Sequence, residues 1–239
     1  MYQKKFEMLG PTDFSVKDLI TDLEIKYQRK PGSVKLLAVS KGQSVDKILK
    51  IYEKGQRAFG ENYCQEALEK IKILPKDIEW HFIGSLQSNK TKSIAQHFNW
   101  VQSVDNLKIA QRLHNQRPAN LPPLNICIQV NIAREKTKSG VSLEEVKELA
   151  KSIRQFNRLQ CRGLMAIPAP SGDVETQKKV FERLKKSFDT LNHEGCDFDT
   201  LSMGMSEDFE SAIAAGSTLV RLGRLIFGER PTKVKGENK

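Results

Sequence analysis

Residues 34–62 read VKLLAVSKGQSVDKILKIYEKGQRAFGEN, and this stretch holds one complete strand–helix–strand unit. The apolar run at 34–39 predicts a buried strand. Ser44 is placed to cap a helix that Gly55 ends, and a second short strand follows at 57–60. Two strands joined through a helix in this way are typical of a parallel sheet in an α/β protein.

The same alternation continues along the chain, after a charged helix predicted at about 13–30. Further strands are predicted at 78–83, 100–103, 124–132, 161–167, 200–204 and 218–222. Asp105 is placed to cap the helix that follows the strand at 100–103. Eight strands alternating with helices within 239 residues favour a single closed (β/α)8 barrel of the TIM type, with an extra N-terminal helix. An open doubly wound sheet is the alternative, although no Gly-x-Gly-x-x-Gly follows the first strand. We expect one domain over 1–239, with a basic tail from about residue 231.

Composition and charge limit the class of protein. Apolar residues make up 38% and charged residues 28% of the chain, as in soluble globular proteins, and no apolar run approaches the roughly 20 residues of a membrane span. The first residues show no secretory signal, so we expect a cytoplasmic protein. The four cysteines and four histidines show no metal-ligand spacing, so no metal site is expected. A net charge of +10 suits either a solvated surface or attraction of anions, such as a phosphorylated small molecule or nucleic acid.

Polar residues and glycines gather where several predicted strands end, and in a barrel these ends meet at one face. Lys41 directly follows the first strand. A lysine held at the barrel rim and partly desolvated has a neutral, nucleophilic amine that can form an imine with an aldehyde. The alternative is a lysine that only reaches into water.

The ends of strands seven and eight predict an anion site. Gly204 and Gly223 would let backbone N–H groups approach a phosphate, and Ser206 precedes a predicted helix, as a phosphate ligand, an N-cap or both. Arg221 lies within strand eight and, if it points inward, needs a partner such as an aromatic ring nitrogen or a carboxylate; otherwise it pairs with an acid in the helix layer. Asn62 either bonds a phenolic oxygen of a ligand, orders a water near that oxygen, or bonds its own backbone.

Six segments, in order along nearly the whole chain, resemble a known family. They are LLAVSK at 36–41, FGENY at 59–63, WHFIGSLQSNK at 80–90, GLMAIP at 163–168, LSMGMS at 201–206, and VRLG at 220–223 with IFG at 226–228. This combination is similar to the pyridoxal phosphate homeostasis protein family, whose members resemble the N-terminal barrel of alanine racemase. The resemblance implies pyridoxal 5′-phosphate (PLP) held as a Schiff base on Lys41, phosphate contacts from the Ser206 loop and the Gly223 region, and Arg221 near the pyridine nitrogen.

Three further residues complete the candidate cofactor site. Asn62 and Met203 lie in segments that carry the resemblance. Arg224 is a departure, because the family often has a small hydroxyl residue after the strand-eight glycine. We expect its backbone N–H to serve the phosphate, and its guanidinium either to bind phosphate or to point away.

The expected function is binding of PLP in cofactor homeostasis, by buffering or delivery and without strong turnover. The chain ends soon after strand eight, so no β-rich second domain like that of alanine racemase is expected, and Lys41 is the one evident acid or base. A weak amino-acid racemase, with Tyr63 or His81 as the second group, is the alternative, although His81 is interpreted as a core histidine. Expected partners are PLP and PLP-dependent apo-enzymes, with no membrane; nucleic acid has no motif to support it. Monomer and weak dimer both stay open.

Overall fold

A computed structural model describes residues 15–133, 135, 138–168 and 173–228. Within these ranges eight parallel strands form a closed barrel in sequence order, and the last strand pairs with the first. The strands are β1 Lys35–Val39, β2 Ala58–Glu61, β3 Glu79–Phe82, β4 Trp100–Val104, β5 Leu124–Val130, β6 Leu159–Ala166, β7 Thr200–Ser202 and β8 Leu219–Leu222. The predicted barrel is confirmed, and the pairing of β1 with β8 excludes the open sheet.

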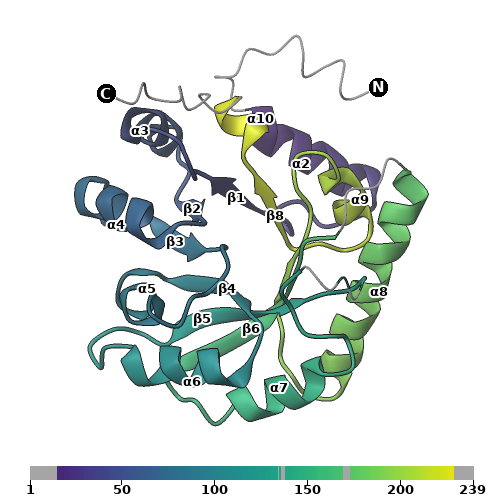
Figure 1. The fold of residues 1–239 in the computed structure, drawn as a ribbon. Coiled ribbons are helices and arrows are strands. Elements are labelled where there is room, and N and C mark those ends of the chain that lie inside the picture. Colours follow the sequence, from purple (N-terminus) through teal and green to yellow (C-terminus); the bar gives the residue numbers. More distant parts are fainter. Residues whose placement is uncertain (1–14, 134, 136–137, 169–172, 229–239) are drawn as a thin grey trace, which may run out of the picture.

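Helices surround the barrel on the outside (Figure 1). They are α2 Ser15–Lys26, α3 Val45–Glu53, α4 Cys64–Ile73, α5 Thr91–His97, α6 Leu107–Gln116, α7 Val146–Ile153, α8 Val174–His193, α9 Phe209–Ala214 and α10 Arg224–Phe227. The extra N-terminal helix, α2, lies against α9, and Lys26 bonds Glu210 there at 2.7 Å. The predicted basic tail lies outside the described residues.

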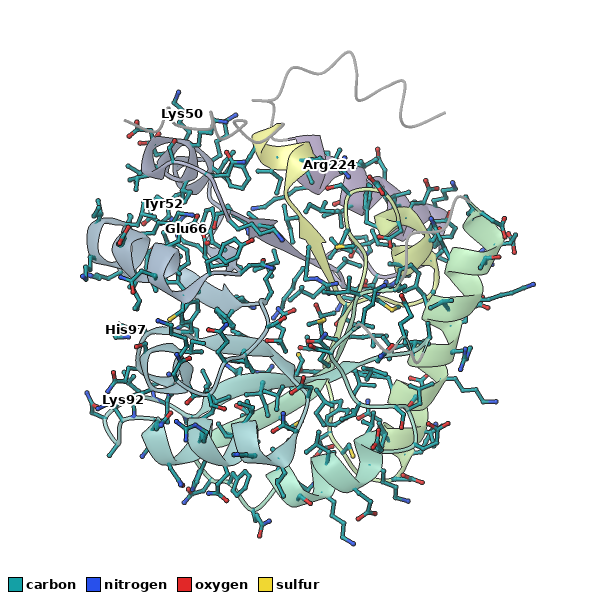
Figure 2. All side chains as sticks on the ribbon, in the orientation of Figure 1. Lys50, Tyr52, Glu66, Lys92, His97 and Arg224 are labelled. Atoms are coloured by element: carbon teal, nitrogen blue, oxygen red, sulfur yellow. The ribbon has the colours of Figure 1, made fainter. Side chains whose placement is uncertain are left out.

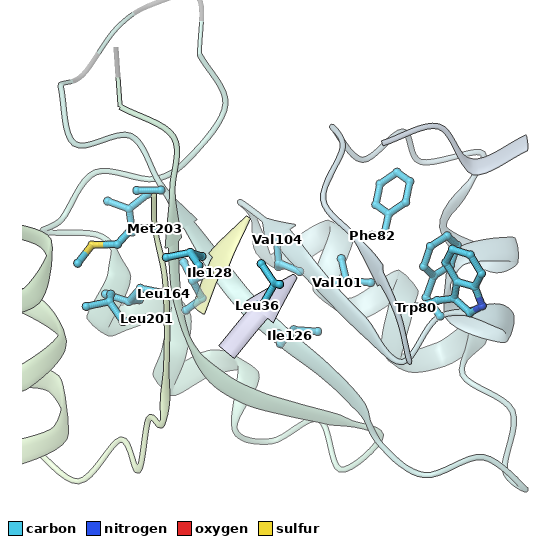
Figure 3. Close-up of a cluster of buried hydrophobic side chains, with 14 of the residues drawn as sticks. Leu36, Trp80, Phe82, Val101, Val104, Ile126, Ile128, Leu164, Leu201 and Met203 are labelled. Atoms are coloured by element: carbon cyan, nitrogen blue, oxygen red, sulfur yellow. The ribbon is translucent and has the colours of Figure 1, made fainter. Parts of the chain in front are cut away.

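Side chains alternate between the two faces of each strand. On β3, Trp80 and Phe82 point outward into the main core between strands and helices (Figure 3), whereas His81 between them faces the barrel interior. Two small apolar clusters fill part of that interior: Leu37 with Ile83 and Leu219, and Trp100 with Cys127 and Met165. The barrel interior is therefore packed with side chains and is not an open channel.

Helix starts were predicted with mixed success. Ser44 is the N-cap of α3, as predicted, and accepts a hydrogen bond from Lys47 N. Asp105 was expected to cap α6, but this is wrong: the cap is Asn106, whose side chain accepts from Ile109 N at 2.9 Å. Asp105 instead accepts from the Asn106 amide, because the helix begins one residue later than expected.

Among the helices that the structure describes, none is both long enough and apolar enough to cross a membrane.

Candidate functional site

Lys41 lies at the barrel rim, two residues beyond β1 and between the ends of β2 and β8. Ser40 extends the pairing with β2, since its N–H donates to the Gly60 carbonyl at 2.9 Å. On the other side Gly223 comes so close that a Cβ there would lie 3.3 Å from the Val39 carbonyl oxygen. The first and last strands of the barrel therefore bring Lys41 and Gly223 to the same mouth.

A charged cluster lies behind Lys41, in the layer between β2 and α4. It consists of Ser40, Glu61, Glu66 and Lys70, and we call it the Glu61 cluster. The Lys70 ammonium contacts Glu61 Oε1 at 2.7 Å, Glu66 Oε1 at 2.6 Å and the Ser40 carbonyl at 2.8 Å. The Ser40 hydroxyl donates to Glu61 Oε1 at 2.6 Å. Glu61 is 0% and Lys70 5% exposed, so this is a buried ion pair.

The Glu61 cluster fixes the backbone on both sides of Lys41. Ser40 is bonded through its hydroxyl and its carbonyl, and the Gly42 N–H donates to Glu66 Oε1 at 2.6 Å. Burial raises the pKa of Glu61, although the Lys70 ammonium opposes this shift. A lysine whose two neighbours are anchored in this way has little freedom to swing its backbone away from the mouth.

Sequence reasoning missed Lys70 and Glu66 as part of the site. The available signal was positional: Lys70 shares a helix face with the buried Cys64 and Ala67, where an apolar residue is expected. A charge on the buried face of a helix requires a buried partner, and such a partner is worth seeking among strand-end carboxylates such as Glu61.

Asn62 follows β2 at the same mouth. Its Oδ1 is buried and has no hydrogen-bond partner within the described part of the chain. A buried amide oxygen in that state is costly unless a ligand or water bonds it. The segment is also tightly packed, because a Cβ on Gly84 would lie 2.1 Å from the Asn62 carbonyl oxygen. The amide therefore fits a role in binding a polar ligand group.

Arg221 points into the barrel, which decides between the two alternatives raised by the sequence. It is 3% exposed, and it donates to Ser202 Oγ at 2.7 Å and to the Ala166 carbonyl at 2.8 Å. Burial lowers the pKa of Arg221 to about 10, with a smaller opposite effect from Asp208. The guanidinium stays charged at neutral pH while bonding two neutral acceptors, an arrangement that suits a further neutral acceptor such as a ring nitrogen.

The segment after β7 differs from its predicted form. Ser206 is predicted as a phosphate ligand, an N-cap or both, and the N-cap part is wrong: the helix begins at Phe209, with Asp208 as its N-cap. The Asp208 carboxylate accepts from Met205 N at 2.6 Å, and this turn takes up the residues expected in the first helical turn. Ser206 is half-buried in that turn, so its candidate role as a phosphate ligand stays a prediction.

The side chains of Met203 and Arg224 lie away from the centre of the mouth. Met203 is fully buried, and its side chain packs in the main core beside Leu201 (Figure 3). Arg224 at the start of α10 (Figure 2) forms an exposed ion pair with Glu207. The Arg224 guanidinium thus links the segments after β7 and β8, and the cofactor-binding roles of both residues stay predictions.

The structure brings Lys41, Asn62, Arg221 and Gly223 to one end of the barrel interior. His81 is a buried, hydrogen-bonded core histidine, as expected. Tyr63 is 62% exposed at the start of α4. Among the residues described, no three His, Cys, Asp or Glu side chains gather as a metal site.

Comparisons with known proteins agree along the whole barrel. The family model "Alanine racemase, N-terminal domain" matches residues 24–231. The pyridoxal phosphate homeostasis protein of Escherichia coli K12 is 48% identical over 219 residues, covering 90% of this chain and 94% of that protein. The protein of the same name from Pasteurella multocida is 51% identical over 208 residues, covering 85% of this chain and 89% of its own length.

Solved structures give the same result. PipY of Synechococcus elongatus, solved with PLP bound, is 32% identical with a TM-score of 0.75, covering 87% of this chain and 100% of that chain. Alanine racemase of Corynebacterium glutamicum shares the fold, at 16% identity and a TM-score of 0.66, covering 93% of this chain and 63% of that chain. With this family model and these relatives, the chain belongs to the pyridoxal phosphate homeostasis protein family, within the group defined by the alanine racemase N-terminal domain.

Proposed function

We propose that this chain binds PLP at the barrel mouth through Lys41, and that it buffers or delivers the cofactor without strong turnover of its own. When bound, PLP supplies an aldehyde that condenses with a lysine amine with loss of water. The observation that carries the proposal is the placement of Lys41, whose neighbours are anchored by the Glu61 cluster at the mouth that Arg221 also faces. The names of the relatives and the PLP-bound structure of PipY support it.

The other residues of the mouth have distinct roles in this proposal. Arg221 donates a hydrogen bond to the ring nitrogen and, because a guanidinium does not give up its proton, leaves that nitrogen unprotonated. A ring kept in this state is a weak electron sink, which suits holding the cofactor more than turnover. Asn62 uses its buried amide to bind the phenolic oxygen. Ser206, Gly223 and the Arg224 backbone bind the phosphate.

The proposal is tested by locating the covalent bond. Protein mixed with PLP should turn yellow, and borohydride should abolish the visible band and attach the cofactor irreversibly to Lys41, as mass spectrometry of peptides would show. Lys41→Ala should lose the band, whereas Lys50→Ala, a matched change of an exposed lysine on α3, should keep it. A label on any other lysine in the native protein would contradict the assignment.

The absence of strong turnover is a separate part of the proposal. His81 does not serve as a second acid or base in this proposal, because both of its ring nitrogens are hydrogen-bonded to protein side chains, Gln102 and Glu79. Long incubation with L-alanine and other amino acids should therefore give no more D-isomer than the Lys41→Ala control. Turnover at an ordinary enzymatic rate, about 1 per second or more, would favour the racemase alternative.

The delivery role places the protein in the cytoplasm, with PLP-dependent apo-enzymes as its partners. Mixing the PLP-loaded protein with a defined apo-enzyme, while a scavenger traps free cofactor, should still restore that enzyme's activity. Restoration only in the absence of the scavenger would limit the role to buffering.

A further inference from the structure

A line of hydrogen-bonded side chains crosses the barrel interior from Arg221 to the opposite end of the barrel. Arg221 donates to Ser202 Oγ at 2.7 Å, and Ser202 donates to Gln102 Oε1 at 2.6 Å. Gln102 Nε2 lies 2.9 Å from His81 Nδ1, and His81 Nε2 lies 2.8 Å from Glu79 Oε1. We call these five residues the Arg221 relay. It joins strands β8, β7, β4 and β3, of which β4 lies across the barrel from β8.

The hydrogen bonds of the relay run in one direction in the structure. The Arg221 guanidinium only donates, so Ser202 accepts from it, and the Ser202 hydroxyl donates its proton to Gln102 Oε1. The Gln102 amide is then oriented with its Nε2 toward His81, where it donates to Nδ1. His81 therefore carries its proton on Nε2 and donates it to the Glu79 carboxylate.

The surroundings hold the relay in this arrangement. Ser202 and Gln102 are 0% exposed and His81 is 1% exposed. The Trp100 ring stacks on the His81 imidazole with 5.1 Å between centroids and 6° between planes. Burial lowers the pKa of His81, against a smaller opposite effect of Glu79, so the imidazole is neutral at neutral pH and Nδ1 keeps its lone pair for Gln102. A buried polar network with every partner in place is rigid and specifies one geometry.

We propose that Ser202, Gln102 and His81 are positioning residues that hold the Arg221 guanidinium for the ring nitrogen of PLP. This inference rests on the proposed function. Two of the guanidinium N–H groups are used in fixed directions, by Ser202 and by the Ala166 carbonyl, which orients the plane of the remaining donors. The relay thereby makes the site selective for ligands whose ring presents an unprotonated nitrogen.

The test compares PLP with an analogue that carries CH in place of the ring nitrogen and keeps the aldehyde and the phosphate. In Ser202→Ala the dissociation constant for PLP should rise about tenfold, and that for the analogue less than about twofold, since the hydrogen bond to Arg221 acts through the nitrogen alone. Ser217→Ala is the matched control: Ser217 is also 0% exposed and hydrogen-bonded, but outside the relay. It should change both constants by less than about twofold. Gln102→Glu keeps the side-chain volume but replaces the N–H donor that faces His81 Nδ1 with an acceptor. This variant should also bind PLP more weakly and leave binding of the analogue nearly unchanged.

The outcomes separate this inference from the proposed function. Equal weakening of both ligands in Ser202→Ala, or no weakening, would overturn the relay while leaving PLP binding intact. Failure of the native protein to bind either ligand would overturn the proposed function itself, and the inference with it. A measurement without cofactor keeps the relay testable if a variant does not fold: nitrogen-15 NMR of the native protein should find His81 neutral with its proton on Nε2. A proton on Nδ1 would refute the direction of the relay.

Discussion

The Glu61 cluster and the Arg221 relay support two neighbouring parts of the same mouth, the Lys41 backbone and the Arg221 guanidinium, by different physical means. In the Glu61 cluster a lysine and two carboxylates meet between a strand and a helix, and Lys70 contacts all its partners directly. In the relay the members between the two charged ends are neutral and follow one another through the barrel interior. Removing one partner of a buried ion pair destabilises the fold, because the other charge stays buried without compensation. Replacing a member of the relay instead leaves its neighbours without a matching donor or acceptor. The two regions should therefore respond differently to substitution.

The largest effect is expected from Lys70→Met. It leaves the Glu61 carboxylate buried without its cation, which should lower the free energy of unfolding by about 3–5 kcal/mol. Denaturant unfolding of the native and variant proteins measures this directly. Lys72→Met, at an exposed position on the same helix, is the matched control and should change stability by no more than about 0.5 kcal/mol. Similar losses in both variants would show that the cluster is not a stabilising pair.

A smaller loss is expected from Gln102→Leu in the relay. The leucine fills a similar volume but leaves Ser202 and His81 each short of one hydrogen bond, for a cost of about 1–3 kcal/mol. Gln160→Leu, at an exposed position on β6, serves as the control under the same unfolding conditions. If Gln102→Leu proved as stable as the native protein, the relay would contribute orientation alone.

The pH dependence of stability separates the two regions further. Burial raises the folded-state pKa of Glu61, and removing Lys70 takes away the charge that opposes this shift. A carboxyl with a raised folded-state pKa binds a proton more readily when folded, so stability increases as pH falls through that pKa. The deficit of Lys70→Met should thus shrink by about 1–2 kcal/mol between about pH 7 and pH 5. Adding Glu61→Gln should remove this slope, and a deficit independent of pH would contradict it.

The smallest effect is expected at the exposed rim. Arg224→Ala removes the ion pair with Glu207, which solvent screens, so stability should fall by less than about 1 kcal/mol, and by less still in high salt. Thermal unfolding at two salt concentrations, with Arg183→Ala as an exposed control on α8, measures the difference. A loss that salt does not reduce would mean that the guanidinium acts through packing.

The fold was predictable because its signals are local. Strands such as β1 are short, mostly apolar runs, and caps such as Ser44 lie within a few residues of the groups they bond. The wrong predictions lie at the ends of helices and strands. Two adjacent short polar residues can each cap a helix, as with Asp105 and Asn106, and the sequence does not show which of them does so. Strand β7 also ends at Ser202, before the predicted 204, where Gly204 adopts a φ of 99°.

The candidate site was predictable only in part, for a related reason. Lys41 and Arg221 stand out because a charged residue follows or interrupts an apolar strand. The residues that hold Arg221 in place cannot be recognised in the sequence in the same way. Ser202 and Gln102 are 100 residues apart, and only the closed barrel brings them together. Pairing across such distances depends on register and on side-chain direction, which a single sequence does not specify.

The pairing of β1 with β8 has a consequence for biosynthesis. Lys41 leaves the ribosome long before Arg221, and the two meet only when the last strand joins the first. A nascent chain therefore has no complete pocket until nearly all of its barrel has been translated. Whatever the mouth takes up must arrive after β8 has been translated and paired with β1. The yellow colour acquired when the protein refolds in the presence of PLP would then report the final step of barrel closure.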